Sequence, residues 1–108
     1  MATHHAAPGE IVNLSTWADD LPEERSKVIA KTPEMELARL LVPAGDGIEN
    51  QHVNGPLIVH CLSGSLVVDA LERTQELGGG ELLYLPPKTR FSLKAKRKAL
   101  VLVTFIFT

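Results

Sequence analysis

The chain has 108 residues, a net charge of −2, 44% hydrophobic residues and a single cysteine. A chain of this length forms one domain and buries a core without disulfide bonds. The slightly acidic balance argues against a nucleic-acid partner, which requires an excess of Lys and Arg. One cysteine excludes an internal disulfide and fits a reducing, cytoplasmic location. The longest apolar run, residues 99–107, is too short to cross a bilayer, so we expect no membrane association.

The beginning of the chain predicts a tail and one short helical element. Residues 1–9 are small and polar and end in Pro8-Gly9, so we expect a tail before a single domain over residues 10–108. Residues 11–14 predict a short strand. Thr16 is a helix N-cap and Pro22 discourages continuation, which predicts a short N-terminal helical turn.

The rest of the chain consists of short apolar runs separated by turn residues. We predict strands at residues 27–31, 34–42, 56–62, 66–69, 74–77, 81–85, 91–95 and 99–107. Short strands with turn signals every ~8–12 residues indicate an all-β sandwich or barrel. Residues 57–62 and 100–106 are apolar on both faces, so something must cover the outside of these strands. We expect a second copy of the chain to do so, which predicts a homodimer.

Two groups of residues resemble the motifs of a known superfamily. Over residues 26–107 the chain is similar to the small, single-domain RmlC-like cupins. The resemblance rests on Gly45 and Gly47 before His52, on Leu62-Ser63-Gly64, and on Gly80 followed by Pro86. It implies a jelly-roll barrel (a double-stranded β-helix) whose interior holds a metal ion through three histidines and a glutamate.

The resemblance also implies that this chain has lost most of those ligands. The two histidines of the first motif fall on Asn50 and His52, its glutamate on Leu57, and the histidine of the second motif on Phe91. A transition metal normally requires three or four His or carboxylate ligands. We therefore expect no metal and no cofactor; if a metal were present, His52 would hold it.

Strand alternation indicates what replaces the metal centre. Phe91, Leu93 and Ala95 share the apolar face of one strand, and Leu57, Val59 and Cys61 share that of another. We expect an apolar cavity lined by Leu57, Val59, Cys61 and Phe91, with Asn50 and His52 as its polar groups. Small-molecule pockets have this mixture of apolar walls and a few polar groups.

Three functions are compatible with such a cavity. The first is metal-free binding of a small, partly apolar molecule. The second is a metal-dependent dioxygenase or isomerase that keeps a weak metal at His52. The third is a structural protein whose cavity is packed shut. We assign no catalytic residue: alternation turns Tyr84 away from the cavity, and the adjacent His60 and Cys61 point to opposite faces. An enzymatic activity is therefore not indicated.

Overall fold

The computed structural model describes residues 5–17 and 26–107. The described residues contain strands and no helix, as the all-β prediction requires. The strands are β1 (Ser26–Lys31), β2 (Met35–Val42), β3 (Gly47–His52), β4 (Leu57–Ala70), β5 (Arg73–Gly78), β6 (Glu81–Leu85) and β7 (Arg90–Ile106). Among these residues no helix is long and apolar enough to span a membrane.

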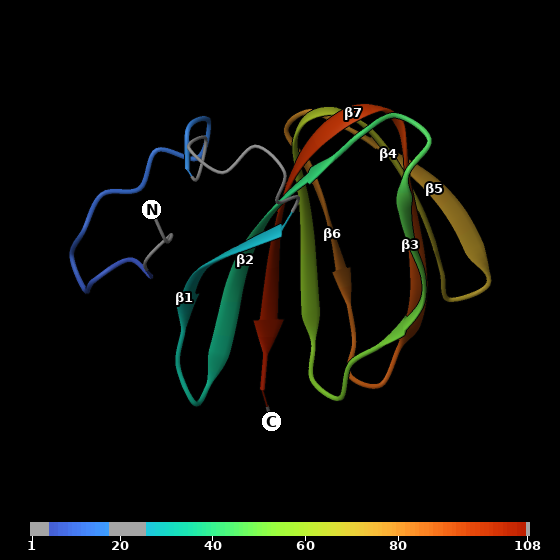
Figure 1. The fold of residues 1–108 in the computed structure, drawn as a ribbon. Coiled ribbons are helices and arrows are strands. Elements are labelled where there is room, and N and C mark those ends of the chain that lie inside the picture. Colours follow the sequence, from blue (N-terminus) through green and yellow to red (C-terminus); the bar gives the residue numbers. More distant parts are fainter. Residues whose placement is uncertain (1–4, 18–25, 108) are drawn as a thin grey trace.

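The strands form two layers that share their two longest members, β4 and β7 (Figure 1). Residues 57–61 of β4 pair with β6, whereas residues 65–70 pair with β5. In β7, residues 99–106 pair with β2 and residues 90–94 pair with β3. We call the layer β1-β2-β7-β4-β6 the first sheet and the layer β3-β7-β4-β5 the second sheet. All pairings are antiparallel, and the two sheets enclose the interior of a jelly roll.

Gly64 marks the corner at which β4 passes from the first sheet to the second. Its backbone has φ = 86°, a left-handed conformation that glycine adopts without steric cost. A Cβ at this position would also collide with the backbone carbonyl oxygen of Lys98. The pairing of β4 with β7 is irregular between Cys61 and Leu66, as expected where a strand bends through a bulge. The glycine expected at a turn thus lies inside one continuous strand.

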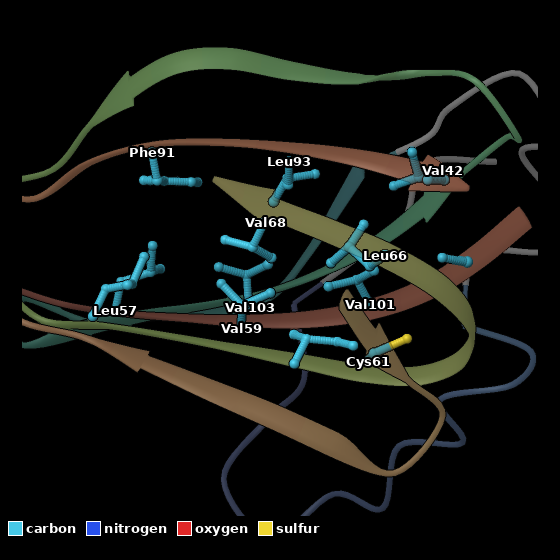
Figure 2. Packing of buried hydrophobic residues seen from close by; sticks show 14 residues of the cluster. Val42, Leu57, Val59, Cys61, Leu66, Val68, Phe91, Leu93, Val101 and Val103 are labelled. Carbon is cyan, nitrogen blue, oxygen red and sulfur yellow. The ribbon is translucent and has the colours of Figure 1, made fainter. Parts of the chain in front are cut away.

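The core fills the space between the sheets (Figure 2). Alternate residues of β4 and β7 point inward, and Leu66, Val68 and Val101 are all at most 1% exposed. A core of this kind is closely packed, so that replacing a buried leucine such as Leu57 with alanine costs about 2–5 kcal/mol.

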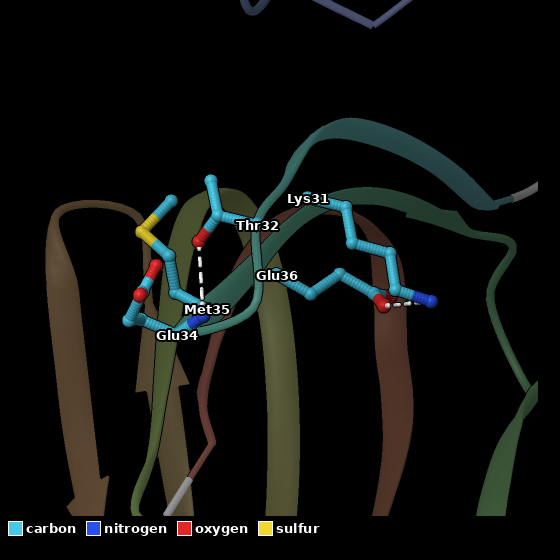
Figure 3. Close-up of polar contacts among 5 residues, drawn as sticks. All are labelled: Lys31, Thr32, Glu34, Met35 and Glu36. Atoms are coloured by element: carbon cyan, nitrogen blue, oxygen red, sulfur yellow. Dashed lines mark hydrogen bonds and ion pairs between the residues drawn. The ribbon is translucent and has the colours of Figure 1, made fainter.

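The turn between β1 and β2 contains Thr32 and Pro33, which lie between two of the predicted strands. The hydroxyl oxygen of Thr32 accepts hydrogen bonds from the backbone N–H groups of Glu34 and Met35, each at 3.1 Å. The Lys31 ammonium lies 3.7 Å from the Glu36 carboxylate across the same hairpin. Figure 3 shows both interactions. A Thr hydroxyl that accepts hydrogen bonds from backbone N–H groups two and three residues later stabilises the turn of a hairpin.

Residues 5–17 lie on the β1 side of the molecule (Figure 1). The Ala6 N–H donates to the Ile29 carbonyl at 2.6 Å. The buried Arg39 side chain on β2 donates to the carbonyls of Leu14, at 2.6 Å, and Ser15, at 3.2 Å. These bonds attach the segment to the first sheet. The division into a tail at residues 1–9 and a domain from residue 10 stays a prediction.

Some expected elements differ from the observed ones. Residues 11–14 do not form a strand. One turn follows them, in which the Trp17 N–H donates to the Asn13 carbonyl at 2.9 Å; the remainder of the expected helical turn lies in residues 18–25, outside the described residues. The predicted strands at 56–62 and 66–69 are one strand, β4, and those at 91–95 and 99–107 are one strand, β7. Strand β3 was not predicted, because all six of its residues are exposed and show no apolar alternation.

Candidate functional site

Four of the predicted site residues lie in the interior (Figure 2): Leu57, Val59 and Cys61 on the part of β4 in the first sheet, and Phe91 on the part of β7 in the second sheet. Leu57, Val59 and Cys61 are 1%, 0% and 0% exposed, and Phe91 is 3% exposed. The intervening β4 residues Ile58, His60 and Leu62 are only partly buried. The alternation read from the sequence is therefore confirmed for both strands.

The polar pair, Asn50 and His52, lies on β3, which contains a bulge. Ile48 is opposite Leu93 and Gln51 is opposite Phe91, so Glu49 and Asn50 together face the single residue Ser92. The extra residue is accommodated by a left-handed Asn50, with φ = 53°, whose N–H donates to the Ser92 hydroxyl at 3.0 Å. One inserted residue reverses the alternation of everything that follows it.

The reversal decides which β3 side chain shares the face of Phe91. Directly opposed residues of an antiparallel pair lie on the same face. Gln51 is opposite the buried Phe91, whereas His52 is opposite the exposed Arg90. The expected position of His52 beside the apolar four is therefore wrong, because His52 lies on the other face of the exposed edge strand β3. Asn50 is also exposed, but it borders a polar depression of about 190 Å³ that Phe91 borders as well. Whether these six residues bind a ligand stays a prediction.

The same register places two further polar side chains on the inner face of the second sheet. Val68 is opposite Gln75, and Ala70 is opposite both Phe91 and Arg73. Since Val68 and Phe91 are buried in the core, Gln75 and Arg73 share the inward face with them. Sequence reasoning missed both residues. Counting back by two from the buried Leu77 along β5 would have found them.

Arg73 and Gln75 border a cavity of about 230 Å³ between β5 of the second sheet and β6 of the first. The apolar walls of the cavity are Val68, Ala70, Leu71, Leu83 and Leu85. Tyr84 also borders it, although its pairing with Ile58 puts the Tyr84 side chain on the outer face of the first sheet. Leu83 is opposite Val59 and Leu85 is opposite Leu57, so the predicted apolar residues stand directly beside this wall. The cavity has the apolar lining and the few polar groups of a small-molecule site.

A tight hairpin forms one edge of this cavity. Leu71 and Glu72 connect β4 to β5, with φ = 54° and 61°. A two-residue turn with both φ angles positive is of type I′, which normally contains Asn and Gly. A leucine in this conformation is strained by about 1–2 kcal/mol. In this turn the Leu71 side chain is 56% exposed and lies at the edge of the cavity.

A second depression lies at the corner between β2 and β3. It has a volume of about 180 Å³, and Leu40, Val42, Pro43, Ile48 and Leu93 contribute to its walls. The polar depression that adjoins it shares Asp46, Gly47 and Leu93 and opens to solvent. A Cβ at Gly47 would collide with the Leu93 carbonyl oxygen, so this corner requires glycine. It contains none of the predicted site residues.

The buried thiol of Cys61 is not activated as a nucleophile. Burial, followed by the nearby negative charge of Glu81, raises the pKa of the Cys61 thiol. The thiol donates to the Ser63 carbonyl at 3.4 Å. A thiol held in its protonated form is unreactive, so Cys61 is a packing residue.

The residues at the family's metal-ligand positions do not fit a metal ion. Leu57 and Phe91 are apolar and buried at two of the four expected ligand positions, and the other two residues, Asn50 and His52, are exposed on β3. Across residues 5–17 and 26–107 there is no group of three or more His, Cys, Asp or Glu side chains arranged to hold a metal.

Solved structures with this fold include cupins. A cupin superfamily protein from Desulfitobacterium hafniense DCB-2 matches 77% of this chain and 76% of its own, with a TM-score of 0.74 and 14% identity. An RmlC-like cupin from Shewanella frigidimarina NCIMB 400 matches 75% of this chain and 73% of its own, with a TM-score of 0.71 and 12% identity. A conserved protein of unknown function from Streptococcus pyogenes matches 100% of this chain and 96% of its own, with a TM-score of 0.82 and 14% identity.

No protein-family model matches the sequence, and no curated protein is similar to it. Identities this low establish a common fold and leave activity open. This chain is a small protein with the RmlC-like cupin fold, as its glycine and proline positions predicted.

Proposed function

We propose that this chain is a metal-independent cupin that binds a small, partly apolar molecule in the interior of the barrel. The observation that carries the proposal is the cavity of about 230 Å³ between β5 and β6, with apolar walls and inward-facing Arg73 and Gln75. Its volume lies below the ~300–1,000 Å³ of drug-sized pockets, which favours a ligand no larger than one ring or a short branched chain. The single free thiol, Cys61, supports a cytoplasmic setting.

The apolar residues at two metal-ligand positions support metal independence. A carboxylate and an imidazole are replaced there by Leu57 and Phe91, which pack into the core. The competing function, a metal-dependent dioxygenase or isomerase, requires His52 to bind a metal together with ligands from elsewhere in the chain.

One binding experiment separates the two functions. Ligand-observed NMR is recorded on the full-length, untagged chain with a panel of small apolar molecules, first in EDTA and then with added Fe²⁺, Mn²⁺ or Zn²⁺. We expect at least one ligand to bind in EDTA, and Ala70→Leu, which fills the cavity, to abolish the binding. His52→Ala, on the exposed edge strand, is the matched control and should bind normally. Binding that requires a metal and is lost in His52→Ala would establish the metal-dependent alternative instead.

We also propose that two copies associate through the outer face of the first sheet. Six apolar side chains occupy this face on β4, β6 and β7: Ile58, Leu62, Leu82, Tyr84, Leu100 and Leu102. Leu82 and Tyr84 are 58% and 57% exposed in the single chain. An apolar sheet face of this extent is typical of an association surface.

A further inference from the structure

We infer that the cavity between β5 and β6 is a site for a small organic anion, a carboxylate with a compact apolar tail, and that Arg73 binds its carboxylate. The inference rests on the proposed function, because it names the class of ligand that the same cavity would take. Three features carry it: the placement of Arg73, the charges of the residues around it, and the division of the cavity into a polar and an apolar side.

Arg73 is the cationic group of the cavity. It lies opposite Ala70 on the inward face, and its side chain has no ion-pair or hydrogen-bond partner among residues 5–17 and 26–107. A guanidinium offers five N–H donors in a planar fork, which matches the two oxygens of a carboxylate. Arg73 is exposed and borders the cavity, so its guanidinium donors are accessible to such a group.

Three acidic residues are close to Arg73 in sequence: Glu72, Asp69 and Glu76. Glu72, the residue before Arg73, lies in the turn and borders a separate depression that also contains Asp69 and Arg90. Asp69 is opposite Thr74, on the outer face of the second sheet, and accepts a hydrogen bond from the Thr74 hydroxyl at 3.4 Å. Glu76 accepts from the Ser65 hydroxyl at 2.7 Å and lies 3.5 Å from the Lys96 ammonium. No Asp or Glu is among the described residues that line the cavity. Arg73 is therefore the charged side chain that a ligand in this cavity would meet.

The other residues around the cavity form a polar side and an apolar side. Gln75 lies two residues from Arg73 on the same inward face and is half-buried, so its amide can donate to an anion or accept from a ligand hydroxyl. Val68 and Leu85, each 1% exposed, and Leu83 form the apolar side that would contact the tail. The volume suits a ring or a branched chain of four or five carbons better than a long acyl chain.

The experiment is isothermal titration calorimetry on the full-length chain at neutral pH. The probes are benzoate and 3-methylbutanoate, their neutral counterparts benzamide and 3-methylbutanamide, and inorganic phosphate as an anion without a tail. We expect each carboxylate to bind at least about ten-fold more tightly than its amide, and phosphate to bind more weakly than either carboxylate.

Variants assign the effect to the cavity. Arg73→Gln should weaken carboxylate binding about ten-fold or more and leave amide binding nearly unchanged, whereas Arg73→Lys should restore part of the affinity. Arg90→Gln removes the same charge from an exposed β7 position opposite His52 and should have no effect. Thermal unfolding of each variant confirms that it is folded.

The outcomes distinguish failure of the inference from failure of the proposed function. Equal binding of acid and amide, or a carboxylate affinity that Arg73→Gln leaves unchanged, overturns the anion site while the cavity still binds small molecules. Carboxylate binding that Arg90→Gln weakens as much as Arg73→Gln indicates a general surface charge effect and also overturns it. If no probe binds and the NMR panel is also negative, the proposed function fails with it.

Discussion

At the scale of single residues, a buried hydroxyl joins a charged pair on the outside of the second sheet. Ser65 is 1% exposed, and its hydroxyl donates to Glu76 at 2.7 Å. This hydrogen bond, followed by the positive charge of Lys96, lowers the pKa of Glu76 from its ordinary value of 4.5. A carboxylate whose pKa is lower in the folded state stabilises the fold only while it is ionised.

The sign of the resulting pH dependence follows directly. The contribution of Glu76 is fully present above pH 4.5 and is lost as the pH falls through the lower pKa of the folded state. We therefore expect Glu76→Gln to reduce the free energy of unfolding at pH 7 and to have a smaller effect at pH 3, as measured by urea denaturation.

Ser65→Ala provides the control for this pH effect, because it removes the hydrogen bond that contributes most to the shift. In the Ser65→Ala background, Glu76→Gln should show a weaker pH dependence. A Glu76→Gln effect that is the same at both pH values would contradict the assignment.

At the scale of elements, irregular backbone positions decide which side chains reach the interior. The bulge at Glu49 and Asn50 turns Gln51 toward the face of Phe91 and His52 away from it. The hairpin between β4 and β5, in contrast, contains no bulge. Its register is regular, and its two-residue turn brings Arg73 opposite Ala70. Register therefore controls the chemistry of the inner face at both edges of the second sheet.

The strained hairpin makes a quantitative prediction. Replacing Leu71 and Glu72 with Asn and Gly supplies the residues that a type I′ turn favours. The free energy of unfolding of the double variant should therefore be about 1–2 kcal/mol higher than that of the wild-type chain. Chemical denaturation measures this change. Because Leu71 borders the cavity, the same variant should bind the apolar tail of a ligand more weakly.

The single variant Glu72→Gly separates the two effects, since it relieves strain and leaves Leu71 in place. We expect it to be stabilised with unchanged ligand affinity. A destabilised double variant would show that the turn does not adopt the left-handed conformation in solution.

At the scale of the whole molecule, the apolar outer face of the first sheet is the surface through which we propose that two copies associate. We expect the chain to sediment as a dimer and the double variant Leu82→Lys/Tyr84→Lys to sediment as a monomer, because four charges would then oppose one another across the interface. Analytical ultracentrifugation over a range of concentrations measures both.

Ile11→Lys is the matched control for association, since Ile11 is 93% exposed and lies in the N-terminal segment, which bonds to β1 and β2. It should leave the dimer intact. A monomeric wild-type chain, or a double variant that remains dimeric, would refute association through this face.

The sequence alone was sufficient for the class of fold and for the interior face of its long strands. Alternation is a local property of a strand, so Leu57, Val59, Cys61 and Phe91 could be placed in the core from their own neighbours. Motif spacing aligned Leu57 and Phe91 with two metal-ligand positions of the cupins that the sequence resembles, and both side chains are buried; the absence of a metal stays a prediction.

Only the tertiary structure decided which polar groups face the interior. The bulge that moves His52 is held by a hydrogen bond between Asn50 and Ser92, which are 42 residues apart, and it has no signature in the local alternation of β3. Arg73 and Gln75 became inner-face residues only through their pairing with Ala70 and Val68. Periodicity determines the faces within one strand, but register and bulges depend on hydrogen bonds between strands, and these decide which face looks inward.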